Sequence, residues 1–177
     1  YNHFTLHQYN PSYLNPASST RNDEVRLAAF HRSQYVGLSS EAIGAQVVSV
    51  DAKLPSRPFT AGIHFSHDYI GLQRLMGLRI DGGWQIIRKD KFLLATGFGL
   101  GFRNLSWAGD QMITPEGIYV GTIDHQDDVL LNTSFNAQGF EWRAGIQLSY
   151  NRLSVDFGSL NFPMAKRNGE NNYNVAA

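Results

Sequence analysis

Residues 76–86, with the sequence MGLRIDGGWQI, decide the fold because large apolar side chains alternate there with glycine, charged or amide residues. Successive side chains of a β-strand point to opposite faces, so this spacing predicts a strand with one apolar and one polar face. Leu78 and Ile80 fall on the apolar face, whereas Arg79 and Asp81 fall on the polar face. A helix would need apolar residues at three- and four-residue spacing, which this alternation does not provide.

The same period of two recurs along the chain and predicts an all-β protein with seven strands. The connections are expected to alternate between tight turns and longer links, as in an antiparallel meander with two unlike rims. Short turns at one rim and long loops at the other are typical of an outer-membrane barrel. The other expected strands are 25–36, 42–53, 59–68, 92–103, 141–151 and 153–157. The expected tight turns are 55–58, 88–91 and 151–152, and the expected longer links are 37–41, 69–73 and 107–139.

Alternation alone does not say which face of the sheet is enclosed. Three details favour a transmembrane antiparallel up-and-down β-barrel, with apolar side chains on lipid and polar side chains in the lumen. Charges of both signs stand at mid-strand between glycines, aromatic residues flank the apolar faces, and the strands run to about 10–12 residues, which suits a tilted membrane crossing. The alternative is a soluble β-barrel or sandwich with a conventional apolar core.

The polar faces define a set of lumen residues, which either forms a binding or conducting surface or fills the barrel by mutual pairing. Arginine suits the filling role because its guanidinium makes bidentate pairs with carboxylates. The lumen residues are His64, Arg79, Asp81, Arg103, Glu141, Arg143 and Asp156. Aromatic residues are expected near the tight-turn rim at Trp84, Phe92 and Tyr150, and near the long-loop rim at Phe102, Trp107 and Trp142.

Composition excludes several classes of function. The chain of 177 residues is expected to form one unit, and its 15 basic residues against 15 acidic ones argue against nucleic-acid binding. Without cysteine there is no disulfide, thiolate nucleophile or Cys-ligated zinc. His64 and His67 are expected on opposite strand faces, so they cannot share a metal ion. With no nucleophile elbow, phosphate loop or His-Glu-x-x-His motif, the sequence predicts no enzyme, catalytic residue, metal or cofactor.

The long link 107–139 holds five acidic residues and no Lys or Arg. It could form a calcium site, dock a basic partner, or be an ordinary solvated loop, and no EF-hand spacing is present. Its acidic residues are Asp110, Glu116, Asp124, Asp127 and Asp128.

Seven strands are not the even number that closes a bacterial single-chain barrel. The last residues, 174–177, also lack the final aromatic strand expected of such a barrel. The visible strands are therefore predicted to be part of a larger barrel, with the chain incomplete at its C-terminus and the total strand number open.

The first 60 residues contain two distinctive motifs. An uncharged segment, 4–17, contains a Leu-Asn-Pro-Ala element at 14–17, and an expected strand ends in Arg-Ser-Gln-Tyr at 32–35. Together these motifs resemble those of the PorP/SprF family of Bacteroidota outer-membrane proteins. The family usually has tryptophan where this chain has Tyr35. The family-motif residues are Tyr9, Asn10, Leu14, Asn15, Pro16, Arg32, Gln34 and Tyr35.

This resemblance implies a non-enzymatic component of the type IX secretion and gliding-motility machinery, in the outer membrane after signal-peptide removal. Such a protein would assist the secretion or surface anchoring of adhesin-type cargo through the cargo's type B C-terminal secretion domain. Its implied partners are that cargo, other type IX secretion components and the lipid bilayer. The alternative function is an outer-membrane channel for uptake of small solutes or lipid.

Two regions are expected along the chain. Residues 1–24 are predicted to be an extended, plug-like segment that lies in the lumen or along the periplasmic rim. Its uncharged part can be enclosed without leaving an unpaired charge. A disordered leader is the alternative. Residues 25–177 are predicted to form the barrel strands.

Overall fold

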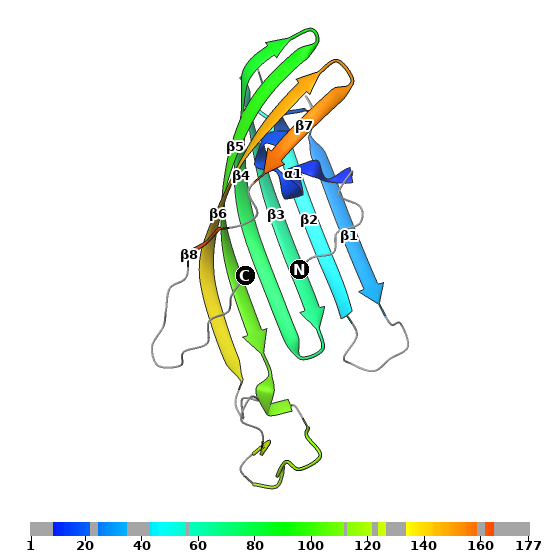
Figure 1. The fold of residues 1–177 in the computed structure, drawn as a ribbon, viewed down its shortest axis with the longest axis vertical. Coiled ribbons are helices and arrows are strands. Elements are labelled where there is room, and N and C mark those ends of the chain that lie inside the picture. Colours follow the sequence, from blue (N-terminus) through cyan, green and yellow to red (C-terminus); the bar gives the residue numbers. More distant parts are fainter. Residues whose placement is uncertain are drawn as a thin grey trace.

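The computed structural model of this chain describes residues 9–21, 25–34, 43–55, 57–111, 113–121, 124–126, 134–158 and 162–164. Within them, strands β1 to β7 follow one another in chain order in one antiparallel sheet, which curls into a half-barrel (Figure 1). A short strand, β8, pairs with β6 beyond β7, so β7 and β8 lie along the same edge of β6. The all-β, seven-strand antiparallel prediction is therefore confirmed. The strands are β1 (Arg26–Gln34), β2 (Ile43–Lys53), β3 (Phe59–Ile70), β4 (Gln73–Lys89), β5 (Phe92–Trp107), β6 (Phe135–Tyr150), β7 (Leu153–Gly158) and β8 (Phe162–Met164).

The sheet is taller than the sequence pattern indicated, and one connection is shorter. Strands β4, β5 and β6 have 17, 16 and 16 residues. The longer link expected at 69–73 is wrong, because β3 and β4 pair as far as Ile70 and Gln73 and only Gly71 and Leu72 turn the chain. Gly71 has a φ of +56°, which glycine adopts without strain. The polar residues at these strand ends continue the ladder although they break the apolar pattern.

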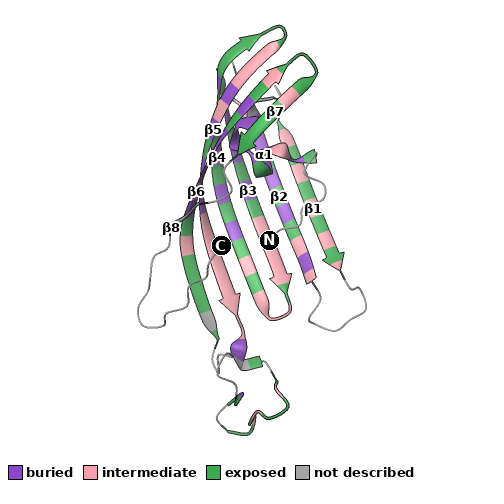
Figure 2. Cartoon of the chain, viewed as in Figure 1, coloured by how far each residue is buried: buried purple, intermediate pink, exposed green. Residues whose placement is uncertain are grey.

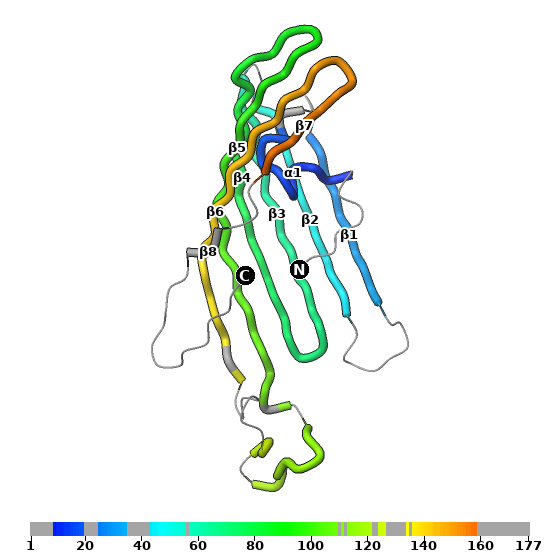
Figure 3. The backbone as a smooth tube through the Cα atoms, in the orientation of Figure 1, coloured from blue at the N-terminus to red at the C-terminus, as the bar shows by residue number. Residues whose placement is uncertain are grey.

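The residues before β1 form two short helices on the concave side of the sheet, near the rim with the tight turns (Figures 1 and 3). They are α1 (Pro11–Leu14) and the 3₁₀ helix η2 (Pro16–Arg21). This differs from the extended conformation predicted for 1–24. Each helix begins at a proline, whose fixed φ suits a first helical residue, and only the preceding Asn15 is extended. Among the described residues, no helix is long and apolar enough to cross a membrane.

Burial in the sheet is the reverse of that in a water-soluble protein. Phe98 and Leu100 are 51% and 54% exposed on the convex face, whereas Asp81 and Arg143 are each 2% exposed on the concave face. Figure 2 shows buried and exposed residues alternating along the central strands. A soluble barrel or sandwich would enclose the apolar face, so this alternative does not fit the described residues. The concave face is called the lumen face below, and the convex face the lipid face.

The aromatic residues expected at the two rims are only partly there. Phe92 and Tyr150 pair with each other beside the tight turns. Trp142, however, pairs with Leu100 near the middle of the sheet. Trp107 ends β5 at the far rim, but its position in the strand alternation puts it on the lumen face with Gly101 and Arg103 rather than on the lipid face. The expected belt at the long-loop rim is therefore wrong for both tryptophans.

Candidate functional site

Strand register gathers the predicted lumen residues into two neighbouring rows across the sheet. Glycines separate the bulky members of the first row, and in the second row a glycine lies between Arg79 and Glu141. A Cβ on Gly101 would lie 2.7 Å from Cγ of Arg79 and 2.8 Å from Cγ of Glu141, so only glycine leaves room for both side chains. The first row is Asp51, Gly62, Asp81, Gly99 and Arg143, and the second is Ser49, His64, Arg79, Gly101 and Glu141.

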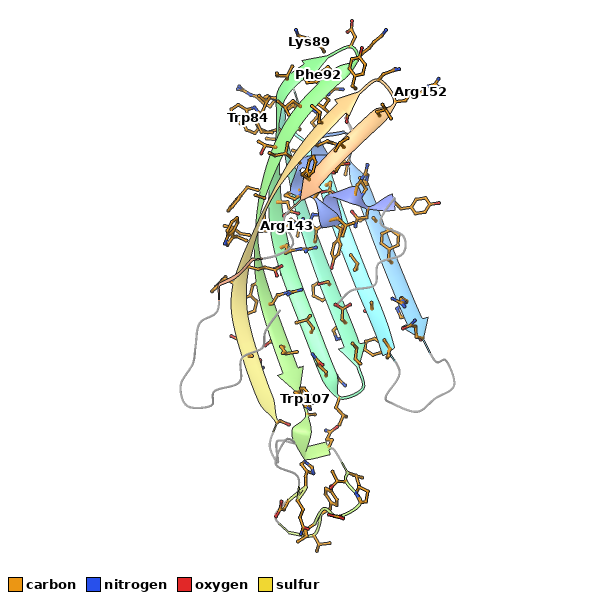
Figure 4. The ribbon with its side chains drawn as sticks, viewed as in Figure 1. Trp84, Lys89, Phe92, Trp107, Arg143 and Arg152 are labelled. Atoms are coloured by element: carbon orange, nitrogen blue, oxygen red, sulfur yellow. The ribbon has the colours of Figure 1, made fainter. Side chains whose placement is uncertain are left out.

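Asp81 is the centre of the buried charge cluster. The Arg143 guanidinium donates to both carboxylate oxygens of Asp81, with Nε 3.0 Å from Oδ1. His64 Nε2 lies 2.6 Å from Oδ2 of the same carboxylate. Buried charges are tolerated only when paired and hydrogen-bonded, and this fork satisfies Asp81 on both oxygens. Figure 4 shows Arg143 on the concave side of β6.

His64 is held in one orientation by a chain of polar groups from the N-terminal segment. Its Nδ1 lies 2.9 Å from Oγ of Ser49, and the amide of Asn10 donates to that hydroxyl at 2.7 Å. Ser49 is therefore free to donate its own proton to Nδ1, which leaves the Nε2 proton of His64 for Asp81. The chain of groups links the N-terminal segment to the charge centre.

The N-terminal segment also supplies acceptors for both buried arginines. Arg143 Nη2 donates to the backbone oxygen of Ser12 at 2.9 Å, and Nη1 donates to that of Tyr13. Arg79 donates to the same Tyr13 oxygen at 3.3 Å, and its guanidinium carbon lies 4.1 Å from the centre of the Tyr13 ring. The hydroxyl of Ser12 donates to Asp51 at 2.6 Å. Residues 10–13 thus close the cluster from the lumen side.

Glycines also form the surface on which the Leu-Asn-Pro-Ala element rests. Gly97, Gly145 and Gly158 pair in register across β5, β6 and β7. A Cβ on Gly97 would occupy the position of the Pro16–Ala17 backbone, and one on Gly145 would overlap the Asn15 side chain. The close approach of the two backbones therefore requires glycine at both positions.

Asn15 fixes this element to the sheet. Its Nδ2 donates to the backbone oxygen of Ile146 at 3.2 Å, and its Oδ1 accepts from the N–H of Ala17 at 3.0 Å. Ser18 next donates to Asp156 on β7 at 3.1 Å. The element is thus bonded both internally and to two strands.

The other predicted residues lie apart from the charge centre. Arg103 Nε is 2.9 Å from Glu141 Oε2, and the Arg103 side chain is partly exposed. Asp156 is on the exposed edge strand. Arg32 and Gln34 lie at the far end of β1, so the structure does not bring them to the N-terminal motif residues. Tyr9 and Leu14 are exposed, and Tyr35 lies outside the described residues.

The acidic residues of the long loop are described only in part. Glu116 and Asp124 are exposed. The side chain of Asp110 and all of Asp127 and Asp128 lie outside the described part. Within the described residues, no group of three or more His, Cys, Asp or Glu side chains could hold a metal ion.

Sequence reasoning missed Ser12, Tyr13, Ser49 and Asp51. Ser49 and Asp51 alternate with Val48 and Val50, which indicates a shared polar face. This signal is weak because the rest of 42–53 does not alternate regularly. Tyr13 acts largely through its backbone oxygen, which side-chain patterns do not reveal.

A family model described as "Type IX secretion system membrane protein PorP/SprF" matches residues 1–176 of the chain. Comparison with curated proteins and with solved structures finds no match.

Proposed function

Because the chain belongs to the PorP/SprF family of type IX secretion system membrane proteins, we propose that it is an outer-membrane barrel that assists the secretion or surface anchoring of adhesin-type cargo. The cargo is held through its C-terminal secretion domain, of the type B class. The protein carries out no catalytic step of its own. Its other partners are components of the same secretion system.

The packing of the N-terminal segment on the lumen face is the observation that carries this proposal. Residues 10–19 lie across β2 to β7, and all of them are buried except Pro11, which is half-buried, and Leu14, which is exposed. Their polar and backbone groups hydrogen-bond to the buried charges Asp51, Arg79 and Arg143. In this reading the N-terminal segment is a plug, and the lumen charges serve to hold it. A barrel plugged by this segment would act as an anchor rather than a conduit.

The outer-membrane location is supported by the sheet itself. Its lipid face carries exposed aliphatic and aromatic side chains on most strands. At one rim β4–β5 and β6–β7 are each joined by two residues, whereas the other rim carries the two-residue β3–β4 turn and a link of more than 20 residues between β5 and β6. In outer-membrane barrels the short turns are periplasmic and the long loops are external, so the rim that carries the long loop faces the outside of the cell.

Deletion of the gene tests this function. Surface display of adhesins that carry a type B C-terminal secretion domain, measured by immunofluorescence on intact cells, is expected to be lost, and complementation with the wild-type gene is expected to restore it. Unchanged secretion and display of these adhesins would contradict the proposal.

Conductance measurements in planar bilayers distinguish the proposed anchor from the alternative, an uptake channel. An anchor with a plugged lumen should show no current in planar bilayers and should co-purify with a large secreted protein. Steady conductance by the wild-type chain would favour the channel.

A further inference from the structure

The long loop between β5 and β6 contains a folded unit at the end of the sheet (Figure 3). It begins with the 3₁₀ helix η3 (Gly109–Gln111) and includes a two-way backbone pairing of Ile118 with Asp124, with N···O distances of 2.6 and 2.9 Å. A turn from Thr114 to Gly117 lies between them. We call the described residues 109–111, 113–121 and 124–126 the loop unit.

His125 lies in the interior of the loop unit and is its central hydrogen-bonding residue. It is fully buried, with Nε2 2.8 Å from the Gly109 oxygen and Nδ1 3.1 Å from the Tyr119 hydroxyl. Thr114 donates through its backbone N–H to that hydroxyl at 2.5 Å and through its Oγ1 to the His125 oxygen at 2.6 Å. These bonds connect the start, middle and end of the unit, so its shape is formed before any partner arrives.

This shape leaves aliphatic side chains outside. Ile113 is 83% exposed, Val120 is 92% exposed and Ile118 is 49% exposed. Thr114 hydrogen-bonds the hydroxyl of Tyr119, so the backbone segments that carry Ile113 and Val120 are tied to each other within the loop unit. Lipid explains exposed aliphatic residues on the sheet but not on a loop beyond its rim. Contiguous exposed apolar residues on a water-facing surface mark contact sites.

The charge of the loop indicates the chemistry of the partner. Glu116 and Asp124 are exposed beside the aliphatic residues, and the sequence from 107 to 139 has no Lys or Arg. Opposite charge across an interface steers association and fixes orientation. The loop surface therefore fits a polypeptide that presents aliphatic side chains flanked by Lys or Arg.

We propose that the loop unit is a preformed docking surface for such a basic, aliphatic polypeptide segment, recognised by Ile113, Ile118, Val120, Glu116 and Asp124. This docking proposal rests on the proposed function in one respect, which is that the partner is a protein outside the cell.

Binding of three synthetic peptides to the full chain in non-ionic detergent tests the proposal, with fluorescence anisotropy as the readout. One peptide alternates Val and Lys, one Val and Glu, and one Ser and Lys. The Val-Lys peptide is expected to bind at least tenfold more tightly than either of the others. Equal binding of all three peptides, or no binding of the Val-Lys peptide, would overturn the proposal.

Two variants locate the surface. The double variant Ile113→Ser, Val120→Ser and the double variant Glu116→Gln, Asp124→Asn should each weaken Val-Lys binding at least tenfold. The matched control, Leu153→Ser with Asp90→Asn, removes an exposed aliphatic residue and an acidic residue at the other rim and should leave binding unchanged. Equal weakening by the control would show non-specific adsorption and contradict the proposal.

His125→Ala tests whether the folded conformation of the loop unit is needed for peptide binding. It leaves every proposed contact residue in place but removes the buried bonds, so binding is expected to fall as in the surface variants. Unchanged binding would contradict a preformed surface. Gene deletion distinguishes the failure of the docking surface from the failure of the proposed function. If adhesin display is lost in the deletion strain but is normal in the Ile113→Ser, Val120→Ser variant, only the docking surface is overturned. If the Val-Lys peptide binds but display is normal in the deletion strain, only the proposed function is overturned.

Discussion

The two faces of the sheet enclose opposite kinds of side chain, although both are built from the same strands. On β4, Ile80 faces outward and Asp81, the next residue, is enclosed with Arg143 and His64. The apolar side chains of the lipid face are stabilised by the surrounding lipid. The polar side chains of the lumen face are stabilised by ion pairs with one another and by hydrogen bonds to the N-terminal segment. A substitution should therefore be judged by the face on which it lies, not by residue type.

Breaking the central pair should have the largest effect. Asp81→Asn leaves the buried Arg143 guanidinium without its carboxylate, which is expected to lower the free energy of unfolding by about 3–5 kcal/mol. Urea unfolding in lipid vesicles measures this. Asp90→Asn in the exposed turn is the control, and a similar small change in both variants would show that the lumen charges are not structurally coupled.

A charge on the other face should cost somewhat less. Leu100→Arg puts a cation toward hydrocarbon and is expected to destabilise the protein in vesicles by about 2–4 kcal/mol. The same change at the exposed loop residue Val120 should be close to neutral. If Leu100→Arg were also neutral in the same vesicle assay, the lipid face would be in water.

Releasing the N-terminal segment tests the lumen face alone. Asn15→Ala removes the bonds to Ile146 and Ala17, with an expected loss of about 1–3 kcal/mol. Because the chain has no cysteine, a single Ser18→Cys reporter can follow the segment. Maleimide should label it at least tenfold faster in the Asn15→Ala background. Tyr9→Ala, in the same segment but exposed, should not change the labelling rate, and equal rates in all three backgrounds would show that Asn15 does not hold the segment.

The smallest effect is expected for an aromatic pair on the lipid face. Phe59 and Trp84 stack with ring centres 5.6 Å apart, and Figure 4 shows Trp84 pointing away from the sheet. Their coupling energy in a double-mutant cycle with Phe59→Leu and Trp84→Leu should be about 0.5–1.5 kcal/mol. A coupling of zero would mean that lipid replaces the lost contact completely.

Period-two alternation was enough to predict the two faces, because burial in a sheet follows residue parity. It also placed Arg79, Asp81 and Arg143 together on the polar face, and the mixed charges, flanking aromatic residues and strand lengths assigned that face to the lumen. Their contacts depend on strand register, which the sequence did not specify. The turn at Gly71 was missed because polar strand ends resemble a loop. The extended conformation predicted for the N-terminal segment differs from the structure because Pro11 and Pro16 each begin a short helix.

The most direct test of the inverted sheet is the environment of single spin labels in a bilayer. Labels are placed at Gly82, Phe98 and Leu100 on the lipid face and at Val120 on the loop, each through an introduced cysteine. The three sheet labels should be accessible to oxygen and protected from a water-soluble nickel complex, with the reverse at Val120. Access of the nickel complex to the sheet labels, equal to that at Val120, would contradict a lipid-facing apolar surface.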